Sequence, residues 1–453
     1  MKTPIHDFIV SYNKQNPKRF HMPGHKGASY LGCEAYDITE IVGADSLYEA
    51  HGIIKESELN ASKLFNSRTF YSTEGSSHAI RAMLSLTLQY AKEKSKNPLI
   101  WAARNAHSTF ISAVALLDFS VKWLYSPHNT YLSCLIEPNT LDKELKKAKQ
   151  LPVAIYITSP DYLGNQAKIF ELANVCHKYD VLLLVDNAHG AYLKFLPTSL
   201  HPIDLGCDMC CDSAHKTLPV LTGGAYLHLS KKRLSFLDSD VKEAFRLFGS
   251  TSPSYLILQS LDLANVYLEQ LTNKLTDFIP IIDTMKQKLI ENGYQLIGNE
   301  PLKLTIATKN YGYSGSEFAK LLAKQNIIVE FFDPDYVVFM FTPSHKEEDI
   351  QYLTDCLIKI PRKQAINISL PQFSYPTKSM SIREAMLSPF ETLPIDKCVG
   401  KVLAKASVGC PPAVPILVCG EVIDEKAVEC FKYYGILSCH VIKQLWLKEH
   451  NNV

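Results

Sequence analysis

The chain has 453 residues, of which 46% are apolar and 21% charged, and this predicts a soluble globular protein of two or three domains. Its 47 Lys and Arg nearly balance its 46 Asp and Glu, so neither a nucleic-acid partner nor membrane docking is expected. No segment resembles a signal peptide or a membrane span. We therefore expect a cytoplasmic protein with reduced thiols.

Short β-rich runs alternate with helical stretches from Lys63 to Leu229, which predicts a mostly parallel α/β sheet. Helical periodicity is clear over Ser77–Lys92 and Ile169–Lys178. The predicted strands of this sheet are Thr69–Ser72, Leu99–Ala102, Val121–Leu124, Val153–Thr158, Val181–Asp186, Asp208–Asp212 and Gly224–Leu229.

Three cysteines near the end of this region, Cys207, Cys210 and Cys211, form a CxxCC cluster of the kind that can bind zinc. No second ligand pair follows at a suitable spacing, and cysteine is among the most buried residue types. We expect these cysteines in a buried strand and predict no metal site.

A long amphipathic stretch, Ser254–Glu291, leads away from the sheet. Two β-like runs, Lys303–Ala307 and Val337–Thr342, flank the helical segment Ser316–Gln325 and predict a smaller α+β domain. The segment Pro361–Ser381 is rich in Pro and Ser and is the candidate linker to a C-terminal module.

Polar residues follow three of the predicted strands. Asp186 ends a buried apolar run, at the sheet edge where α/β proteins bind ligands. Lys216 follows another short strand, and the Gly–Ser turn in Tyr71–His78 offers free N–H groups suited to a phosphate. Each feature alone has an ordinary structural explanation. Together they supply what pyridoxal phosphate (PLP) requires, namely an amine for its aldehyde, an acid for its ring nitrogen and a phosphate cradle.

The sequence resembles a known family at Lys216 in Ser-Ala-His-Lys-Thr-Leu-Pro and at Arg19–Lys26, which reads RFHMPGHK. These segments are similar to the Orn/Lys/Arg decarboxylases, PLP enzymes of the aspartate-aminotransferase fold (fold type I). Further similar segments are Asp37–Glu40, Gly52–Glu56, Arg104–His107, Thr158–Tyr162, Thr251–Tyr255 and Pro411–Glu421.

The resemblance implies an α/β fold with a mostly parallel central sheet, a small α+β domain and a C-terminal module. We expect residues 1–36 to form an N-terminal arm and residues 37–265 a large PLP-binding domain. Residues 266–365 then form the small domain, and residues 366–453 form the C-terminal domain of the decarboxylase type.

The family's roles transfer to matching positions. The resemblance implies that Lys216 holds PLP as a Schiff base and that Asp186 binds the ring nitrogen. It implies that His107 stacks on one ring face, that Ala188 packs on the other, and that His189 points toward the ring hydroxyl. Lys216, His107 and Asp186 are the expected catalytic residues. The residues expected at the phosphate are Gly75, Ser76, Ser77, Ser213 and His215.

The implied reaction converts arginine, lysine or ornithine to the corresponding amine and CO2, as in polyamine biosynthesis. A basic substrate needs a carboxylate for its distal cation, and the candidates are Glu74, Asp161 and Glu330. The alternatives are another fold-type-I PLP enzyme, either an aminotransferase or a lyase, and a non-catalytic relative. Beyond residue 300 the only arginines are Arg362 and Arg383, and neither suits the carboxylate clamp of an aminotransferase. Retention of the three expected catalytic residues argues against a non-catalytic relative.

The chain departs from the family pattern at four positions. Glu74 and Asn187 stand where the family usually has Asn and Glu, and Cys410 and Ala413 stand where it commonly has Tyr and Gly. The last two bear on the substrate pocket. Because HMPGHK begins at His21, the extra N-terminal domain of larger members is missing, and we expect a homodimer or dimer of dimers rather than rings. In that assembly the resemblance places Ser250–Ser252 at the partner's phosphate.

Overall fold

The computed structural model describes residues 1–126, 130–368, 371, 376–405, 409–410 and 413–443. The chain divides into two compact units. Unit 1 contains residues 1–97, 138–159 and 168–276, and unit 2 contains residues 98–137, 160–167 and the chain from 277 onward. Within the described ranges, none of the helices has the length and apolar character needed to cross a membrane.

The core of unit 1 is a sheet whose strands lie in the order β1-β7-β6-β5-β4. Strands β4, β5 and β6 are parallel, whereas β7 is antiparallel to both of its neighbours. Every residue of β5 and β6 is buried, as expected for strands covered on both faces. The strands are β1 Arg68–Ser72, β4 Ala154–Thr158, β5 Leu182–Asp186, β6 Met209–Asp212 and β7 Ala225–Leu229.

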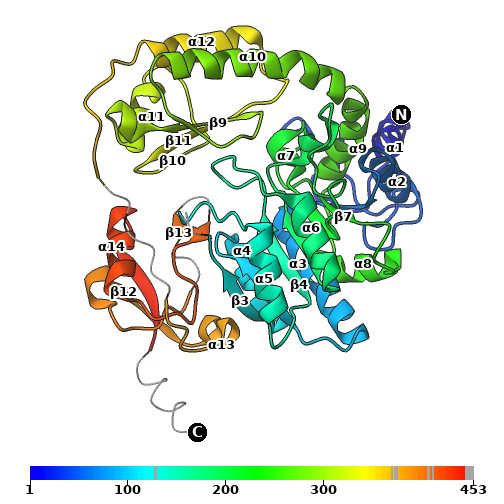
Figure 1. Ribbon diagram of the computed structural model, residues 1–453. Coiled ribbons are helices and arrows are strands. Elements are labelled where there is room, and N and C mark those ends of the chain that lie inside the picture. Colours follow the sequence, from blue (N-terminus) through cyan, green and yellow to red (C-terminus); the bar gives the residue numbers. More distant parts are fainter. Residues whose placement is uncertain (127–129, 369–370, 372–375, 406–408, 411–412, 444–453) are drawn as a thin grey trace. The chain divides into compact units, whose positions relative to one another are not determined.

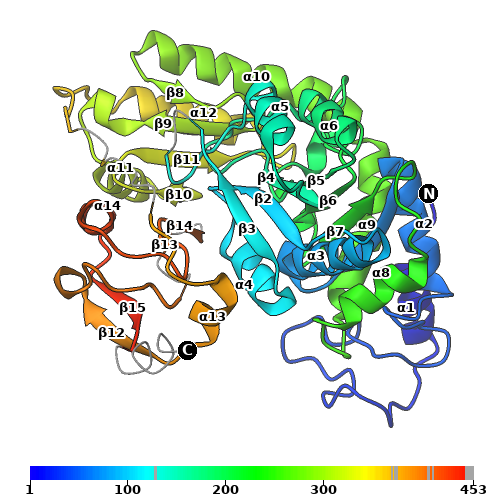
Figure 2. The same ribbon diagram turned by 60° about the horizontal axis from the view of Figure 1, so that its bottom comes forward.

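Helices cover both faces of these strands (Figure 2). On one face α3 (Gly75–Glu93) packs against β6, β7 and α8 (Asp238–Arg246). On the other, α6 (Ile169–Lys178) packs against β5 and α5 (Pro138–Lys147). The predicted mostly parallel sheet and the predicted buried position of the three cysteines are both confirmed.

The N-terminal helix of unit 1, α1 (Pro4–Lys14), packs against α2 (Ile53–Phe65) and α9 (Tyr255–Glu269). Its first turn is tied to the buried Asp262 of α9, whose Oδ2 accepts from the N–H groups of residues 5 and 6 at 2.9 and 3.0 Å. Burial raises the pKa of Asp262 to about 6.

Unit 2 contains the parallel pair β2 (Leu99–Ala103) and β3 (Ser120–Leu124), with α4 (Ser108–Leu117) between them in the chain. It also contains a four-stranded antiparallel sheet of order β10-β11-β9-β8, in the yellow-green part of Figure 1. These elements are β8 Leu296–Ile297, β9 Lys303–Ala307, α11 Gly315–Ala323, β10 Phe331–Phe332, β11 Tyr336–Met340 and α12 Glu347–Ile358. The two predicted β-like runs and the helix between them are thus present.

The long amphipathic stretch predicted over Ser254–Glu291 forms two helices. Helix α9 ends at Glu269, Gln270 is its C-cap residue, and α10 (Leu271–Glu291) begins directly after it.

The C-terminal part of unit 2 contains the antiparallel pair β12 and β15 and a shorter pair, β13 and β14. Part of the candidate linker, residues 369–370 and 372–375, lies outside the described residues. The elements here are α13 Ile382–Leu387, β12 Phe390–Pro394, β13 Gly409–Cys410, β14 Val414–Pro415, α14 Glu425–Tyr433 and β15 Ser438–Ile442. Short 3-10 turns are Ala191–Phe195, Thr308–Tyr311 and Ile395–Lys397.

Candidate active site

Asp186 is the last residue of β5, and it is 3% exposed. Its Oδ2 accepts from the Tyr156 hydroxyl at 3.2 Å, and its Oδ1 accepts from the backbone N–H of Ala188 at 3.3 Å. The thiol of Cys211 lies 3.7 Å from Oδ1. Because these three donors are neutral, they orient the carboxylate without neutralising its charge.

Lys216 lies in α7 (Ala214–Thr217), a four-residue helix that follows β6 almost directly. Its Nζ is 3.0 Å from Nε2 of His189, three residues after Asp186. The turns after β5 and β6, which are parallel neighbours, therefore meet at this contact. The structure thus brings the predicted acid, histidine and lysine to one edge of the sheet.

The predicted phosphate turn begins α3. Gly75 has φ +76° and donates its N–H to Gly223 O at 2.7 Å, and a Cβ built on Gly75 would meet nothing within 4 Å. The next residue, Ser76, accepts from the hydroxyl of Ser213 at 2.7 Å. Two of the predicted hydroxyls and the open N-terminus of a 19-residue helix therefore lie together, as an anion site requires.

The remaining predicted phosphate residues are near this turn in the chain. Ser77 follows Ser76 in α3. His215 donates its backbone N–H to Gly224 O at 3.2 Å, and its Nδ1 lies 3.0 Å from the same oxygen. Burial lowers the pKa of His215, which favours a neutral ring with its proton on Nδ1.

His107 belongs to unit 2, where it is the N-cap residue of α4. Its Nδ1 accepts from the backbone N–H of Thr109 at 3.1 Å, which places the proton of a neutral ring on Nε2. Its predicted stacking on the cofactor remains a prediction.

Arg104, three residues before His107, forms a buried ion pair that was not anticipated. Its Nη2 donates to Glu421 Oε2 at 2.9 Å and to Ile416 O at 3.1 Å. Ser108 N also donates to Ala413 O at 2.8 Å. Within unit 2 the segment around His107 is thus bonded to the C-terminal signature. Two residues of that signature, 411 and 412, lie outside the described chain.

The three candidate carboxylates for a substrate cation have different surroundings. Asp161 is fully buried and accepts from the N–H groups of Leu163 and Asn165, both at 2.9 Å, so it stabilises a turn. Glu74 accepts from Ser250 N at 2.7 Å, and Glu330 accepts from the Tyr162 hydroxyl at 2.7 Å. Glu74 and Glu330 have fewer such bonds than Asp161.

Two residues of the site were missed from the sequence. Tyr156 could have been noticed as a hydroxyl-bearing residue inside an apolar strand, two positions before the strand end that pairs with Asp186. Glu421 lies inside the recognised C-terminal segment, but its partner is 317 residues away, and local patterns carry no signal for such a pairing.

Comparison with known proteins agrees with this geometry. A family model described as Orn/Lys/Arg decarboxylase, major domain, matches residues 3–298, and the model of that family's C-terminal domain matches residues 364–443. An arginine decarboxylase of Halalkalibacterium halodurans is 29% identical, covering 94% of this chain and 91% of the relative. An arginine decarboxylase of Bacillus subtilis is 26% identical, covering 94% and 92%.

A solved structure shows the same fold. The lysine decarboxylase LdcF of Francisella novicida superposes with a TM-score of 0.79 at 19% identity, covering 97% of this chain and 81% of that chain. The predicted fold class is therefore confirmed, as is the prediction of an amino-acid decarboxylase. The chain belongs to the Orn/Lys/Arg decarboxylase family.

Proposed function

We propose that the chain uses PLP to decarboxylate a basic amino acid, with arginine the first substrate to test. The observation that carries this proposal is the 3.0 Å contact between Lys216 Nζ and His189 Nε2, three residues from the buried carboxylate of Asp186. A lysine amine reacts with a carbonyl only as the neutral base, and a histidine acceptor at this distance can take its proton.

The surroundings of Asp186 fit the ring of PLP. A buried carboxylate is costly unless a cation neutralises it, and the recorded partners of Asp186 in the described chain are all neutral. A protonated pyridine nitrogen would supply the missing positive charge. The hydroxyl of Thr158, opposite Asp186 on β4, is buried and lacks a partner among the described residues. It is a further polar group available to a ligand at this edge.

Each predicted site residue then has a defined task. Lys216 would bind the cofactor aldehyde, Asp186 would keep a proton on the ring nitrogen, and His189 would accept from Lys216 and from the ring hydroxyl. Ala188 and His107 would pack on the ring faces. The phosphate would be held at the start of α3 by Gly75, Ser76, Ser77, Ser213 and His215.

When bound, PLP supplies a protonated ring that draws electrons from the substrate α-carbon as CO2 departs. The residues of the chain hold this ring protonated and in place. Lys216, once released from the cofactor, has an amine beside His189, so this pair can return a proton to the α-carbon.

Arginine is the preferred substrate because relatives that match over nine tenths of this chain are arginine decarboxylases. Of the candidate carboxylates, Glu74 and Glu330 remain for the distal guanidinium, because Asp161 already caps a turn. Lysine and ornithine are the competing substrates.

The direct test measures CO2 release from PLP-loaded protein offered arginine, lysine and ornithine in parallel. Release from one of them is expected. Lys216→Ala should abolish this release, whereas Lys232→Ala, at an exposed lysine of the same unit, should leave it unchanged. Absence of a Lys216-dependent visible absorbance would overturn the cofactor assignment. Normal absorbance with no CO2 from any of the three would overturn the substrate class and favour an aminotransferase or lyase.

We also propose a homodimer or dimer of dimers, a cytoplasmic location and a role in polyamine biosynthesis. The dimer is supported by apolar side chains that are exposed in the single chain between α1 and α2, including Phe20, Leu31 and Val42. We propose as well that the boundaries between the domains of the chain lie at residues 36, 265 and 365.

A further inference from the structure

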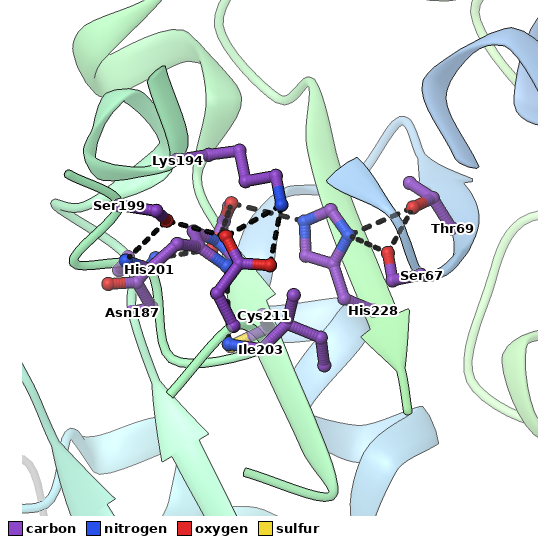
Figure 3. Close-up of polar contacts among 12 residues, drawn as sticks. Ser67, Thr69, Asn187, Lys194, Ser199, His201, Ile203, Cys211 and His228 are labelled. Carbon is purple, nitrogen blue, oxygen red and sulfur yellow. Dashed lines mark hydrogen bonds and ion pairs between the residues drawn. The ribbon is translucent and has the colours of Figure 1, made fainter. Parts of the chain in front are cut away.

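Asp212, the last residue of β6, is a fully buried carboxylate with three side-chain partners. Its Oδ1 accepts from Nδ2 of Asn187 at 2.7 Å, and its Oδ2 lies 3.0 Å from His201 Nε2 and 3.1 Å from His228 Nε2. Figure 3 labels Asn187, His201 and His228 among the residues of this region and marks their polar contacts with dashed lines. The three partners come from the turn after β5, from a loop and from β7.

The second nitrogen of each ring fixes where the protons are. Nδ1 of His201 accepts from the backbone N–H of Ile203 at 3.3 Å, so the proton of a neutral ring sits on Nε2 and is donated to Asp212. Nδ1 of His228 lies 3.0 Å from the hydroxyl of Thr69, which can donate to it. Burial lowers the pKa of His228, and its single proton is therefore also directed at Asp212.

Three N–H donors therefore surround one carboxylate. Burial by itself would raise the pKa of Asp212, but His201 and His228 outweigh it and hold the pKa far below its ordinary value. Asp212 is ionised at all ordinary pH values and acts as a fixed acceptor.

Two of these residues, His201 and Asp212, lie near Cys210, but we do not interpret the three as a metal centre. His201, Cys210 and Asp212 have ligand atoms within 4.8 Å of one another, close enough to invite that reading. However, both ring nitrogens of His201 are committed, one to Asp212 and one to Ile203. The arrangement is a hydrogen-bonded network.

This network joins the two strand ends that carry the proposed site. Asn187 directly follows Asp186, and its backbone N–H also donates to Cys211 O at 3.0 Å. Beyond Asp212 the chain continues directly into the turn that carries Lys216. A shift of Asp212 relative to Asn187 would therefore change the separation between the acid and the amine.

We propose that Asp212 and Asn187 are positioning residues that hold Asp186 and Lys216 at the separation the cofactor requires. This inference rests on the proposed function. It also explains the departure from the family pattern at position 187. Asn187 Nδ2 lies 2.7 Å from Asp212 Oδ1, so the Asn amide supplies the donor that Asp212 needs, whereas the family's longer Glu would bring a second carboxylate toward the same group.

Exchanging the two side chains tests the inference. Asn187→Asp sets two carboxylates against each other, and we expect the dissociation constant for PLP, followed by its visible absorbance, to rise at least about tenfold. The pH profile of that absorbance should also shift, which a merely structural change would not produce. In Asn187→Asp/Asp212→Asn the amide again donates to the carboxylate and its oxygen still accepts from both histidines. PLP affinity should then return to within about threefold of wild type.

A buried carboxylate just before the start of the same strand provides the matched control. Asp208 accepts from Leu183 N at 2.8 Å and from Arg233 Nε at 2.9 Å. Asp208→Asn should lower the thermal midpoint while leaving the affinity for PLP unchanged. If Asn187→Asp does not give soluble protein, Asn187→Ala removes the donor without a charge clash and should still weaken PLP binding.

The inference is overturned if Asn187→Asp behaves like Asp208→Asn, losing stability but binding PLP as wild type does. It is equally overturned if PLP binding is lost and the exchanged pair does not restore it. Wild-type protein with no Lys216-dependent absorbance would instead contradict the proposed function, so the two failures are distinguishable.

Discussion

Arg104 and Glu421 form an ion pair in unit 2 in which the side chains are 4% and 6% exposed. Replacing Arg104 with Met leaves the Glu421 carboxylate buried without its cation. Because an uncompensated buried charge is costly, we expect Arg104→Met to destabilise unit 2 by about 3–5 kcal/mol. The thermal midpoint of the protein measures this loss.

Two further variants separate the charge from the packing. Glu421→Gln keeps an oxygen that can accept from Val418 N but leaves the Arg104 guanidinium buried without its counter-charge, so it should also be clearly destabilising. The double variant Arg104→Met/Glu421→Leu removes both charges and should be more stable than Arg104→Met alone. An unchanged midpoint in Arg104→Met would show that the pair contributes nothing.

Single residues differed in how well the sequence predicted them. Asp186 and Lys216 were recognisable because Asp186 ends a buried strand and Lys216 lies four residues beyond the end of the next one, and the ends of such strands mark the binding edge of the sheet. In the sequence, Asn187 was recognisable only as a departure from the family pattern. Its purpose depends on Asp212, 25 residues away, and therefore on strand pairing that a linear pattern does not specify.

At the scale of elements, the seven strands predicted up to Leu229 match the observed ones to within one residue at either end. Most of them are short apolar runs between turn residues and are buried on both faces, whereas β3 alternates between exposed and more buried positions. The boundary between α9 and α10 was not recognisable in the sequence, because only Gln270 separates the two helices. The four-residue α7 is too short for periodicity to reveal.

Helix α1 provides a test of pH dependence. Asp262, which binds its first turn, has a folded pKa of about 6, whereas an unfolded Asp titrates near ~3.9. The folded chain therefore binds this proton more tightly, and the associated stability is present below about pH 4 and lost as the pH rises through 6. At about 1.4 kcal/mol per unit the effect is at most on the order of 3 kcal/mol.

We expect the difference in thermal midpoint between wild type and Asp262→Asn to move in favour of wild type as the pH falls from about 7.5 to about 5. The amide does not titrate, so the variant lacks this dependence. Asp277→Asn, at an exposed position of α10, should follow wild type. A difference that is the same at both pH values would contradict the assignment.

At the scale of the whole molecule, the segment between α1 and α2 exposes apolar side chains in the single chain. Leu31 is 88% exposed and Val42 is fully exposed. We expect sedimentation to give a dimer. Leu31→Asp and Val42→Asp should weaken it, because each would bury a charge in the interface between the two copies. Ile328→Asp, at an 85% exposed position in the small domain, is the matched control. A monomeric wild type that binds PLP normally would refute the dimer.

The two units are interleaved along the chain, and this affects how the protein is made. Unit 1 lacks β5, β6 and β7 until the ribosome has passed residue 229, and it is complete only after residue 276. Residues 98–137 emerge much earlier, yet apart from residues 160–167 the rest of unit 2 begins at residue 277. The nascent chain therefore carries β2 and β3 for well over a hundred residues of synthesis before most of unit 2 is available, and incompletely folded segments of this kind are prone to misfold.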